Sequence, residues 1–209
     1  MRVRPITPTG LVNELADRIA GARPGSWARV ALDGAPPARP GDLGDALVAP
    51  LRLRGRDVVR VSASAFLRQA SLRLEYGRTD PDSFHDDWFD FGALEREVLG
   101  PLAPGGSGQV LTVLRDVRSD RAARLPYVPV PPGAVLLLDG GLLLGRGLPF
   151  DLTVHLWLSP GALDRRLDDD ERWTLPAYAR YEHDTQPVDA ADIVVKMDDL
   201  EHPALVETA

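Results

Sequence analysis

The stretch that decides the fold is Val30-Ala-Leu-Asp-Gly-Ala-Pro-Pro-Ala-Arg-Pro-Gly-Asp-Leu-Gly-Asp-Ala-Leu47. A short apolar run ending at Asp33 precedes Gly34, and Leu43 and Leu47 follow at the i, i+4 spacing of one helical face. A strand, a glycine-containing loop and a helix in this order have the layout of a phosphate-binding loop, G-x-x-x-x-G-K-[ST]. The sequence therefore predicts a buried strand, a loop from Gly34 to Gly41 and a helix.

The loop has the length of this motif but different chemistry. With Gly34 as the first glycine, the three diagnostic positions are Arg39, Pro40 and Gly41, and the one lysine of the chain is Lys196. The three prolines of the loop lack the backbone N–H that would face a phosphate oxygen. Asp42 follows at the position where we expect the helix N-cap, so its carboxylate would take the helix amides. Gly34, Arg39 and Gly41 are the candidate phosphate-binding residues, and we expect weak or absent ATP binding.

Composition narrows the class of protein. A chain of 209 residues can bury one core, which favours a single domain over residues 1–209. No run approaches the ~20 apolar residues of a membrane span, and the N-terminus lacks a signal-like apolar run, so we expect a cytoplasmic protein without a membrane partner. The absence of cysteine excludes disulfides and thiolate catalysis. A net charge of −7 argues against nucleic acid as a partner.

The order of elements indicates an α/β protein with a doubly wound parallel sheet. An amphipathic helix is expected over residues 9–21, with Leu11, Leu15 and Ile19 on one face. Short apolar runs predict strands, and helical patterns separate most of them. The expected strands are Trp27–Asp33, Asp57–Ser62, Ala134–Asp139, Leu152–Leu158 and Asp192–Met197.

An insertion is expected between the second and third of these strands, over residues 66–132. It contains a predicted helix, Asp90–Leu99, and a predicted β-hairpin with arms Gln109–Asp116 and Arg121–Val130 around Arg118-Ser-Asp120. We expect the hairpin to pack at one edge of the sheet.

One stretch of the insertion carries a family resemblance. Residues 76–94, Tyr-Gly-Arg-Thr-Asp-Pro-Asp-Ser-Phe-His-Asp-Asp-Trp-Phe-Asp-Phe-Gly-Ala-Leu, are similar to the pattern R-G-x-x-S-P-x-x-F-Y-x-D-S-[FY]-D-Y-x-A-L of the uridine kinase family. The residues in register are Gly77, Pro81, Phe84, Asp87, Phe89, Asp90 and Leu94. Weaker matches are Gly100-Pro-Leu102, Pro104-Gly-Gly106, Asp139-Gly140, Ala191–Val195 and Asp199–Pro203, so the resemblance extends from about Val30 to Leu205.

The resemblance implies a P-loop kinase fold and transfer of a phosphoryl group from ATP–Mg²⁺ to the 5′-hydroxyl of a nucleoside. The family's D-x-F, whose carboxylate is the expected base, appears here as Ser64-Ala-Phe66. Serine at its ordinary pKa is not a base for this step without a partner. Asp139 is the candidate carboxylate on the magnesium side, and Asp139 and Ser64 are the candidate catalytic residues. In the lid-like region, Arg166 and Arg180 are the arginines that could meet phosphate.

A nucleoside-like small molecule is the expected ligand. The resemblance places Phe66, Phe84, Asp87, Asp139 and Arg180 around its pocket, with an apolar wall for a base and polar groups for a ribose. Arg78 and His85 lie in the same matching stretch and are further candidates for substrate binding.

Several of these residues have ordinary structural interpretations. His85-Asp86-Asp87 contains metal-ligand types, but we assign no metal, because Asp90 nearby is better explained as the cap of a helix beginning at Phe91. His155 is expected to be a packed strand histidine, and His183 a solvated helix end. Ser64 lacks the G-x-S-x-G context of a hydrolase nucleophile.

Three functions remain open from the sequence. The first is a uridine kinase-like enzyme that binds ATP and Mg²⁺ through Arg39, Arg166 and Arg180, since arginine binds phosphate well. The second is a non-catalytic binding or scaffold protein. The third is an enzyme with phosphate-independent chemistry, using Asp87, Asp139 and His85. A homo-oligomer also remains open.

Overall fold

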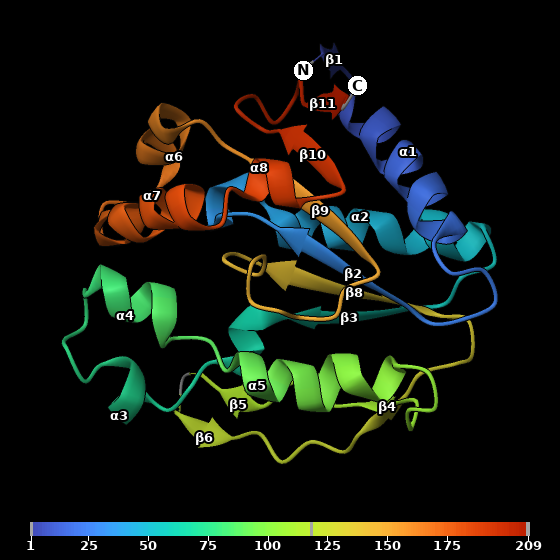
Figure 1. The fold of residues 1–209 in the computed structure, drawn as a ribbon, viewed down its shortest axis with the longest axis horizontal. Coiled ribbons are helices and arrows are strands. Elements are labelled where there is room, and N and C mark those ends of the chain that lie inside the picture. The colour runs from blue at the N-terminus through green and yellow to red at the C-terminus, as the bar shows by residue number, and fades with distance from the viewer. Residues whose placement is uncertain (1, 118, 208–209) are drawn as a thin grey trace.

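The computed structural model describes residues 2–117 and 119–207, and within them seven strands form one central sheet. The strand order is β1-β11-β10-β9-β2-β8-β3 (Figure 1). Their bounds are β1 Arg2–Pro5, β2 Ala28–Asp33, β3 Val58–Ser62, β8 Val135–Gly140, β9 Leu152–Trp157, β10 Ile193–Lys196 and β11 Ala204–Glu207.

Five of these strands, β10, β9, β2, β8 and β3, run parallel, which confirms the predicted core sheet. The strands are short apolar runs buried by helices, as expected for parallel sheets. The register brings Asp33 opposite Gly140 on β8 and opposite His155 on β9. Ser62 pairs with Asp139 in the same way. The carboxyl ends of the central strands therefore carry the polar residues.

Two strands, β1 and β11, were not among those expected from the sequence. They add antiparallel pairs at one edge of the sheet and place the two ends of the described chain side by side (Figure 1). Each has only four residues; β1 alternates arginine with Val3 and is mostly exposed, and the apolar part of β11, Ala204–Val206, is only three residues long. Arg4 joins this edge to helix α1 (Pro8–Gly21) through its ion pair with Glu14, with nitrogen and oxygen 2.7 Å apart.

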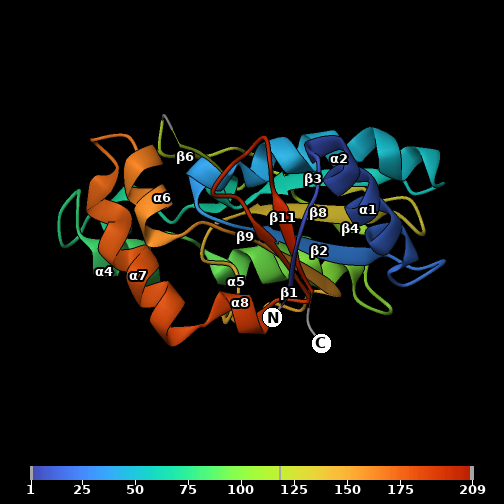
Figure 2. The same cartoon turned by 90° about the horizontal axis from the view of Figure 1, so that it is seen from above.

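Helices cover both faces of the sheet. The long helices α1 (Pro8–Gly21) and α2 (Pro40–Leu53) lie on one face, and α5 (Phe91–Leu94) and α8 (Pro187–Ala190) lie on the other (Figure 2). The remaining helices lie toward the carboxyl ends of the strands: α3 (Ala70–Arg73), α4 (Pro81–Asp86), α6 (Pro160–Arg166) and α7 (Leu175–Asp184). This arrangement confirms the doubly wound α/β architecture.

The predicted helix Asp90–Leu99 is present in two parts. Asp90 caps α5 by accepting a hydrogen bond from the Ala93 amide at 2.8 Å, as the sequence indicated. The chain continues from Leu94 as a π-helical turn, Glu95–Leu99. Wider turns of this kind occur as short interruptions of helices.

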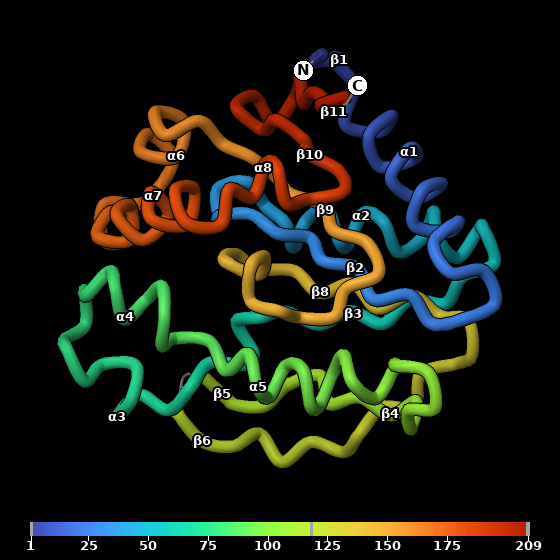
Figure 3. The backbone as a smooth tube through the Cα atoms, in the orientation of Figure 1, coloured from blue at the N-terminus to red at the C-terminus, as the bar shows by residue number. Residues whose placement is uncertain are grey.

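The hairpin of residues 109–130 is present but less regular than expected. It pairs at two places, β4 (Gln109–Val110) with β7 (Val128–Pro129) and β5 (Arg115–Asp116) with β6 (Arg121–Ala122). Of the predicted turn Arg118-Ser-Asp120, Arg118 lies outside the described residues. Figure 3 places this segment beyond β3, beside α5. The Leu114 amide anchors it by donating to the carbonyl of Ala65 at 3.0 Å.

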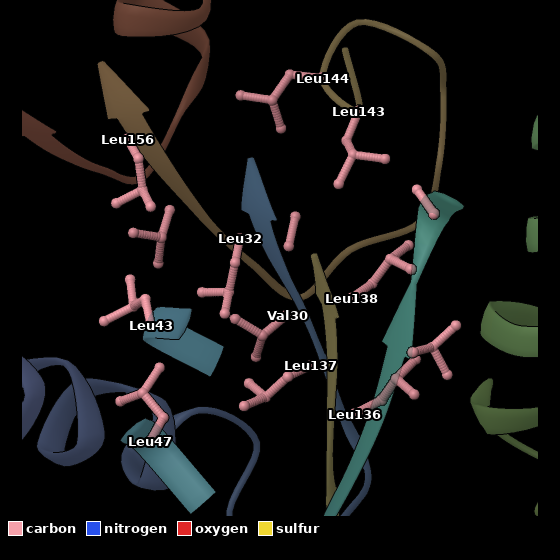
Figure 4. Packing of buried hydrophobic residues seen from close by; sticks show 14 of the residues in the cluster. Val30, Leu32, Leu43, Leu47, Leu136, Leu137, Leu138, Leu143, Leu144 and Leu156 are labelled. Carbon is pink, nitrogen blue, oxygen red and sulfur yellow. The ribbon is translucent and has the colours of Figure 1, made fainter. Parts of the chain in front are cut away.

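The core covers both faces of the sheet. Val30 and Leu32 on β2 and Leu137 on β8 lie on the face that packs against Leu43 and Leu47 of α2, whereas Leu136 and Leu138 point to the opposite face (Figure 4). Burial of these side chains contributes roughly 1.5–3 kcal/mol each. The core thus fixes the loop between β2 and α2 to the carboxyl end of the sheet. No helix among the described residues is long and apolar enough to cross a bilayer.

Candidate functional site

The loop between β2 and α2 forms a tight turn whose amides are largely in use. A 3₁₀ turn, Pro36–Ala38, leads to Arg39 in the left-handed region at φ 56° and ψ 51°. Within residues 34–40, six lack a free N–H: Gly34, Ala38 and Arg39 donate to backbone carbonyls, and Pro36, Pro37 and Pro40 have no N–H. An anion over this loop would therefore meet few amide donors.

The predicted cap of α2 is wrong. The helix begins at Pro40, so Arg39 is its N-cap, and no side chain caps it. Asp42 is the third helical residue, and its side chain is 75% exposed. Its carboxylate still lies in the first turn, where it interacts favourably with the helix dipole. Proline at the first helical position is the sequence signal that fixes this start.

Asp139 is held by Arg60, a residue that the sequence did not single out. Nη2 of Arg60 donates to Oδ1 of Asp139 at 2.6 Å and to the carbonyl of Gly41 at 3.1 Å. Nη1 reaches Oδ1 of Asp45 at 2.5 Å. Arg60 thus joins β3, β8 and α2 at the position where a magnesium-side carboxylate was expected.

Gly44 makes room for this guanidinium. A Cβ atom at Gly44 would lie 2.5 Å from Cζ of Arg60, so a larger residue would displace it. An arginine inside the apolar strand Val58–Ser62, together with a glycine in the facing helix, was the available signal. A single sequence does not show that these two positions face each other.

A second buried polar group centres on Asp33. Oδ2 of Asp33 accepts from Nδ1 of His155 at 2.7 Å and from the hydroxyl of Tyr181 at 3.0 Å, and Oδ1 accepts from the Leu143 amide at 2.9 Å. Burial and then the charge of Asp33 raise the pKa of Tyr181. The Leu144 amide donates to the same hydroxyl at 3.0 Å. This network joins β2, β9 and α7.

Glu182 lies at the edge of this network. Its Oε1 is 3.9 Å from Nε2 of His155. Burial raises the pKa of Glu182, the His155 ring opposes this rise, and Asp33 adds to it. His155 is buried, as the sequence indicated, and it also lines a cavity beside helices α6 and α7.

The candidates for substrate binding and catalysis between residues 64 and 87 lie in several separate contacts. Phe66 is fully buried in the core, and Phe84 packs edge-to-face on four aromatic rings, those of Trp88, Phe89, Trp173 and Tyr178. Nη1 of Arg68 lies 2.5 Å from Oδ1 of Asp87. Arg78 is exposed, and Ser64 is exposed with its Oγ 2.9 Å from that of Ser62.

His85 is buried under Arg146. Its Nδ1 lies 2.6 Å from Oδ1 of Asp86, and Nη2 of Arg146 donates to its carbonyl at 2.6 Å. Burial lowers the pKa of Arg146. Among the described residues, no group of three or more His, Cys, Asp or Glu side chains could hold a metal ion.

The two lid-region arginines are bound to other parts of the protein. Arg166 donates to the carbonyls of Met197 at 2.8 Å and Asp198 at 2.5 Å. Arg180 on α7 reaches Asp86 at 2.7 Å and Asp82 at 3.1 Å, both on α4. Burial would raise the pKa of Asp86, but His85 and Arg180 lower it. Helices α4 and α7 are therefore joined across the carboxyl end of the sheet.

Of the nominated phosphate ligands, Arg39 remains exposed, with 63% of its side chain accessible and Nη1 3.9 Å from Asp42. Gly34 permits close contact with β9, because a Cβ atom there would lie 3.0 Å from the Leu156 carbonyl oxygen. Gly41 lies beside Asp139, with 3.7 Å from its Cβ position to Oδ2. Lys196 lies on β10, which β9 separates from β2, and its Nζ is 5.1 Å from the Trp157 ring centre.

Comparison with solved structures identifies the fold. The chain is similar to a possible uridine kinase from Bacillus stearothermophilus, with a TM-score of 0.71 and 17% identity over 88% of this chain and 96% of that chain. It is also similar to a putative fructose transport system kinase from Silicibacter sp. TM1040, with a TM-score of 0.58 and 23% identity; the match covers 89% of this chain and 95% of that chain. A third match is the YGR205w protein, with a TM-score of 0.56 and 10% identity; the match covers 97% of this chain and 100% of that chain.

No protein-family model and no curated protein sequence matches the chain. The chain has a P-loop kinase-like fold, as expected from the sequence. At these identities the similarity shows the fold alone.

Proposed function

We propose that this protein uses a P-loop kinase-like fold to bind a nucleoside-like small molecule and does not transfer phosphate from ATP. The observation that carries this proposal is the ion pair of Arg60 with Asp139, 2.6 Å apart and largely buried. It neutralises the carboxylate that was expected to serve the magnesium side of a kinase site.

The residues present do not fit ATP–Mg²⁺. Magnesium is bound through carboxylates and phosphates, and here the guanidinium of Arg60 already occupies Asp139. Phosphoryl transfer depends on positioning and on stabilisation of negative charge. The loop after Gly34 has few free amides, and the lysine of the motif is replaced by Pro40. The loop and Asp139 therefore lack the free groups that phosphoryl transfer from ATP–Mg²⁺ would need.

The arginines support the same conclusion. Arg166 is bonded to two backbone carbonyls, and Arg180 is surrounded by the acidic residues Asp82, Asp86 and Asp184. Neither guanidinium is free for a triphosphate. Exposed Arg39 favours a second candidate function, a phosphotransferase that holds its donor through this one arginine.

Binding is favoured over phosphate-independent chemistry. Such chemistry would need a free acid or base, whereas Asp139 is paired with Arg60, Asp87 with Arg68, and the Nδ1 atom of His85 with Asp86. The residues in register with the uridine kinase pattern cluster between Gly77 and Leu94, so the nucleoside side is where a ligand is expected.

A thermal-shift screen with uridine, cytidine, adenosine and guanosine tests the ligand. A nucleoside that binds the folded state raises the melting temperature. Asp87→Ala should abolish that rise while changing the unliganded melting temperature little, because its partly exposed pair with Arg68 contributes about 0–1 kcal/mol. Asp189→Ala, an exposed carboxylate on α8, is the matched control and should keep the rise.

If the wild-type protein responds to none of these nucleosides, the ligand proposal is wrong. If Asp87→Ala lowers the unliganded melting temperature but the nucleoside still raises it as in the wild type, Asp87 has a structural role only.

A further inference from the structure

A cavity of about 440 Å³ lies beside the carboxyl end of β9, between the start of the loop after β2 and helices α6 and α7. Its wall is mostly apolar and includes Leu142, Leu156, Leu163, Leu175 and Tyr178. Cavities of this size and lining are typical of small-molecule sites. Its polar lining side chains include His155, Asp164, Tyr181 and Glu182, and these indicate what kind of molecule it would accept.

The proton positions of His155 follow from the contacts of Asp33. Three donors converge on this fully buried carboxyl group: Nδ1 of His155, the Tyr181 hydroxyl and the Leu143 amide. The Tyr181 hydroxyl donates to Asp33 and accepts from the Leu144 amide. A carboxylate only accepts, so Nδ1 of His155 carries the proton of this contact, and we assign the lone pair to Nε2 because it has no acceptor within hydrogen-bond distance.

This Nε2 atom is buried and has no hydrogen-bond partner. The His155 side chain is 5% exposed, and the nearest carboxylate oxygen, on Glu182, is 3.9 Å away. A buried polar atom left unpaired costs roughly 1–3 kcal/mol. Because Nδ1 of the ring is held by Asp33, the ring does not turn to another partner, and the cavity that His155 lines is the nearest space from which a ligand could supply a donor.

We propose that this cavity binds an uncharged, largely apolar small molecule that donates one N–H or O–H hydrogen bond to Nε2 of His155. Anions are disfavoured, because the described lining residues include Asp164 and Glu182 and no lysine or arginine. Cations are disfavoured by the apolar wall, where losing hydration is costly. The proposal does not rest on the function proposed above, since it uses neither Asp87 nor the pairing of Arg60 with Asp139.

Matched probe pairs test the hydrogen bond. The two members of each pair have nearly the same shape, but in the second member a methyl group replaces the hydrogen of the O–H or N–H donor. The pairs are 2-naphthol and 2-methoxynaphthalene, indole and 1-methylindole, and cyclohexylmethanol and its methyl ether. Calorimetry on the full chain should give about tenfold tighter binding for the donor of at least one pair, the ratio that corresponds to about 1.4 kcal/mol. The ¹⁵N resonance of His155 Nε2 should shift with that donor and not with its methylated partner.

Two variants locate the binding. His155→Phe should remove the preference for the donor. Ala179→Trp, at an exposed helical position that lines the cavity, should block both members of the pair while leaving the His155–Asp33 contact intact. Ala49→Trp on an exposed position of α2 is the matched control and should bind as the wild type does.

The proposal is overturned if all pairs bind without preference for the donor, if no donor probe binds, or if Ala179→Trp binds as tightly as Ala49→Trp.

Discussion

At the scale of single residues, Arg60 has the largest influence on the site. It brings a guanidinium under the first turn of α2, where it contacts Asp139, Asp45 and the Gly41 carbonyl. A kinase-like loop needs positive charge directed at its ligand. Here the positive charge is directed at the protein's own carboxylates.

Removing Arg60 should expose the cost of the unpaired carboxylate. Arg60→Leu leaves Asp139 charged at 6% exposure, and we expect the free energy of unfolding to fall by roughly 2–4 kcal/mol. Arg60→Leu with Asp139→Leu should recover part of this loss, because no charge then remains buried. Urea unfolding, monitored by circular dichroism, measures the free energy of unfolding of both variants. If the two losses simply add, the pair is not coupled and the interpretation is wrong.

Restoring the motif residues alone should not restore ATP binding. In the triple variant Arg39→Gly, Pro40→Lys, Gly41→Thr, Pro36 and Pro37 still form the 3₁₀ turn and Arg60 still occupies Asp139. We expect calorimetry to show less than about a tenfold gain in ATP–Mg²⁺ affinity. Adding Pro36→Gly, Pro37→Gly and Arg60→Leu should raise the affinity further. A triple variant with micromolar affinity would mean that the loop reshapes freely.

At the scale of elements, helices α4 and α7 are joined by both aromatic contacts and ion pairs. Phe84 of α4 contacts Trp173 and Tyr178, and Arg180 of α7 contacts Asp82 and Asp86. These contacts cross the carboxyl end of the sheet, where α/β proteins bind ligands. The mobility of α4 is therefore expected to depend on this contact.

Phe84→Ala tests that dependence. Aromatic pairs contribute about 0.5–1.5 kcal/mol each beyond burial, so losing the ring should cost roughly 2–4 kcal/mol. Amide exchange should accelerate together in residues 81–94 and 172–184, because the two helices support each other. Phe150→Ala, outside this cluster, serves as the control. Faster exchange in only one of the two segments would contradict the coupling.

The elements that the sequence predicted are those with strong local signals. The five parallel strands are apolar runs, and Asp90 caps its helix because aspartate before a helical segment is a strong signal. The strands β1 and β11 are short and have little or no apolar run. Asp42 was wrongly predicted to be a cap, because the helix begins at Pro40 after the left-handed turn at Arg39. Arg60 and the Asp33–His155 pair depend on strands brought together by the fold, which local pattern does not show.

At the scale of the whole molecule, Asp151 links distant parts of the chain. It accepts from the side chain and amide of Arg29 on β2, each at 2.9 Å, and pairs with Arg23 at 2.9 Å. Burial alone would raise the pKa of Asp151, but the hydrogen bonds from Arg29 and Arg23 lower it to about 2. The start of β2 and the start of β9 are fixed together in this way.

The acid stability of the protein should therefore depend on Asp151. Because its folded pKa lies below its unfolded value, its stabilisation is complete above the unfolded pKa of about 4 and is lost as pH falls toward 2. We expect a loss of roughly 2 kcal/mol across that window. Asp151→Asn should be less stable at pH 7 and should show a smaller loss between pH 4 and pH 2, measured by urea unfolding at each pH. Asp57→Asn, an exposed carboxylate, is the control. An unchanged pH profile in Asp151→Asn would contradict the role of this group.

The central claim is that the P-loop kinase-like fold is kept here without an ATP–Mg²⁺ site. The most direct test is isothermal titration calorimetry of the full chain with ATP–Mg²⁺. We expect no heat of binding at micromolar ligand concentrations, because the loop offers few amides and Arg60 already neutralises Asp139. Micromolar affinity for ATP–Mg²⁺ that is lost in Arg39→Ala would contradict the claim and would favour a phosphotransferase that uses Arg39 in place of the lysine.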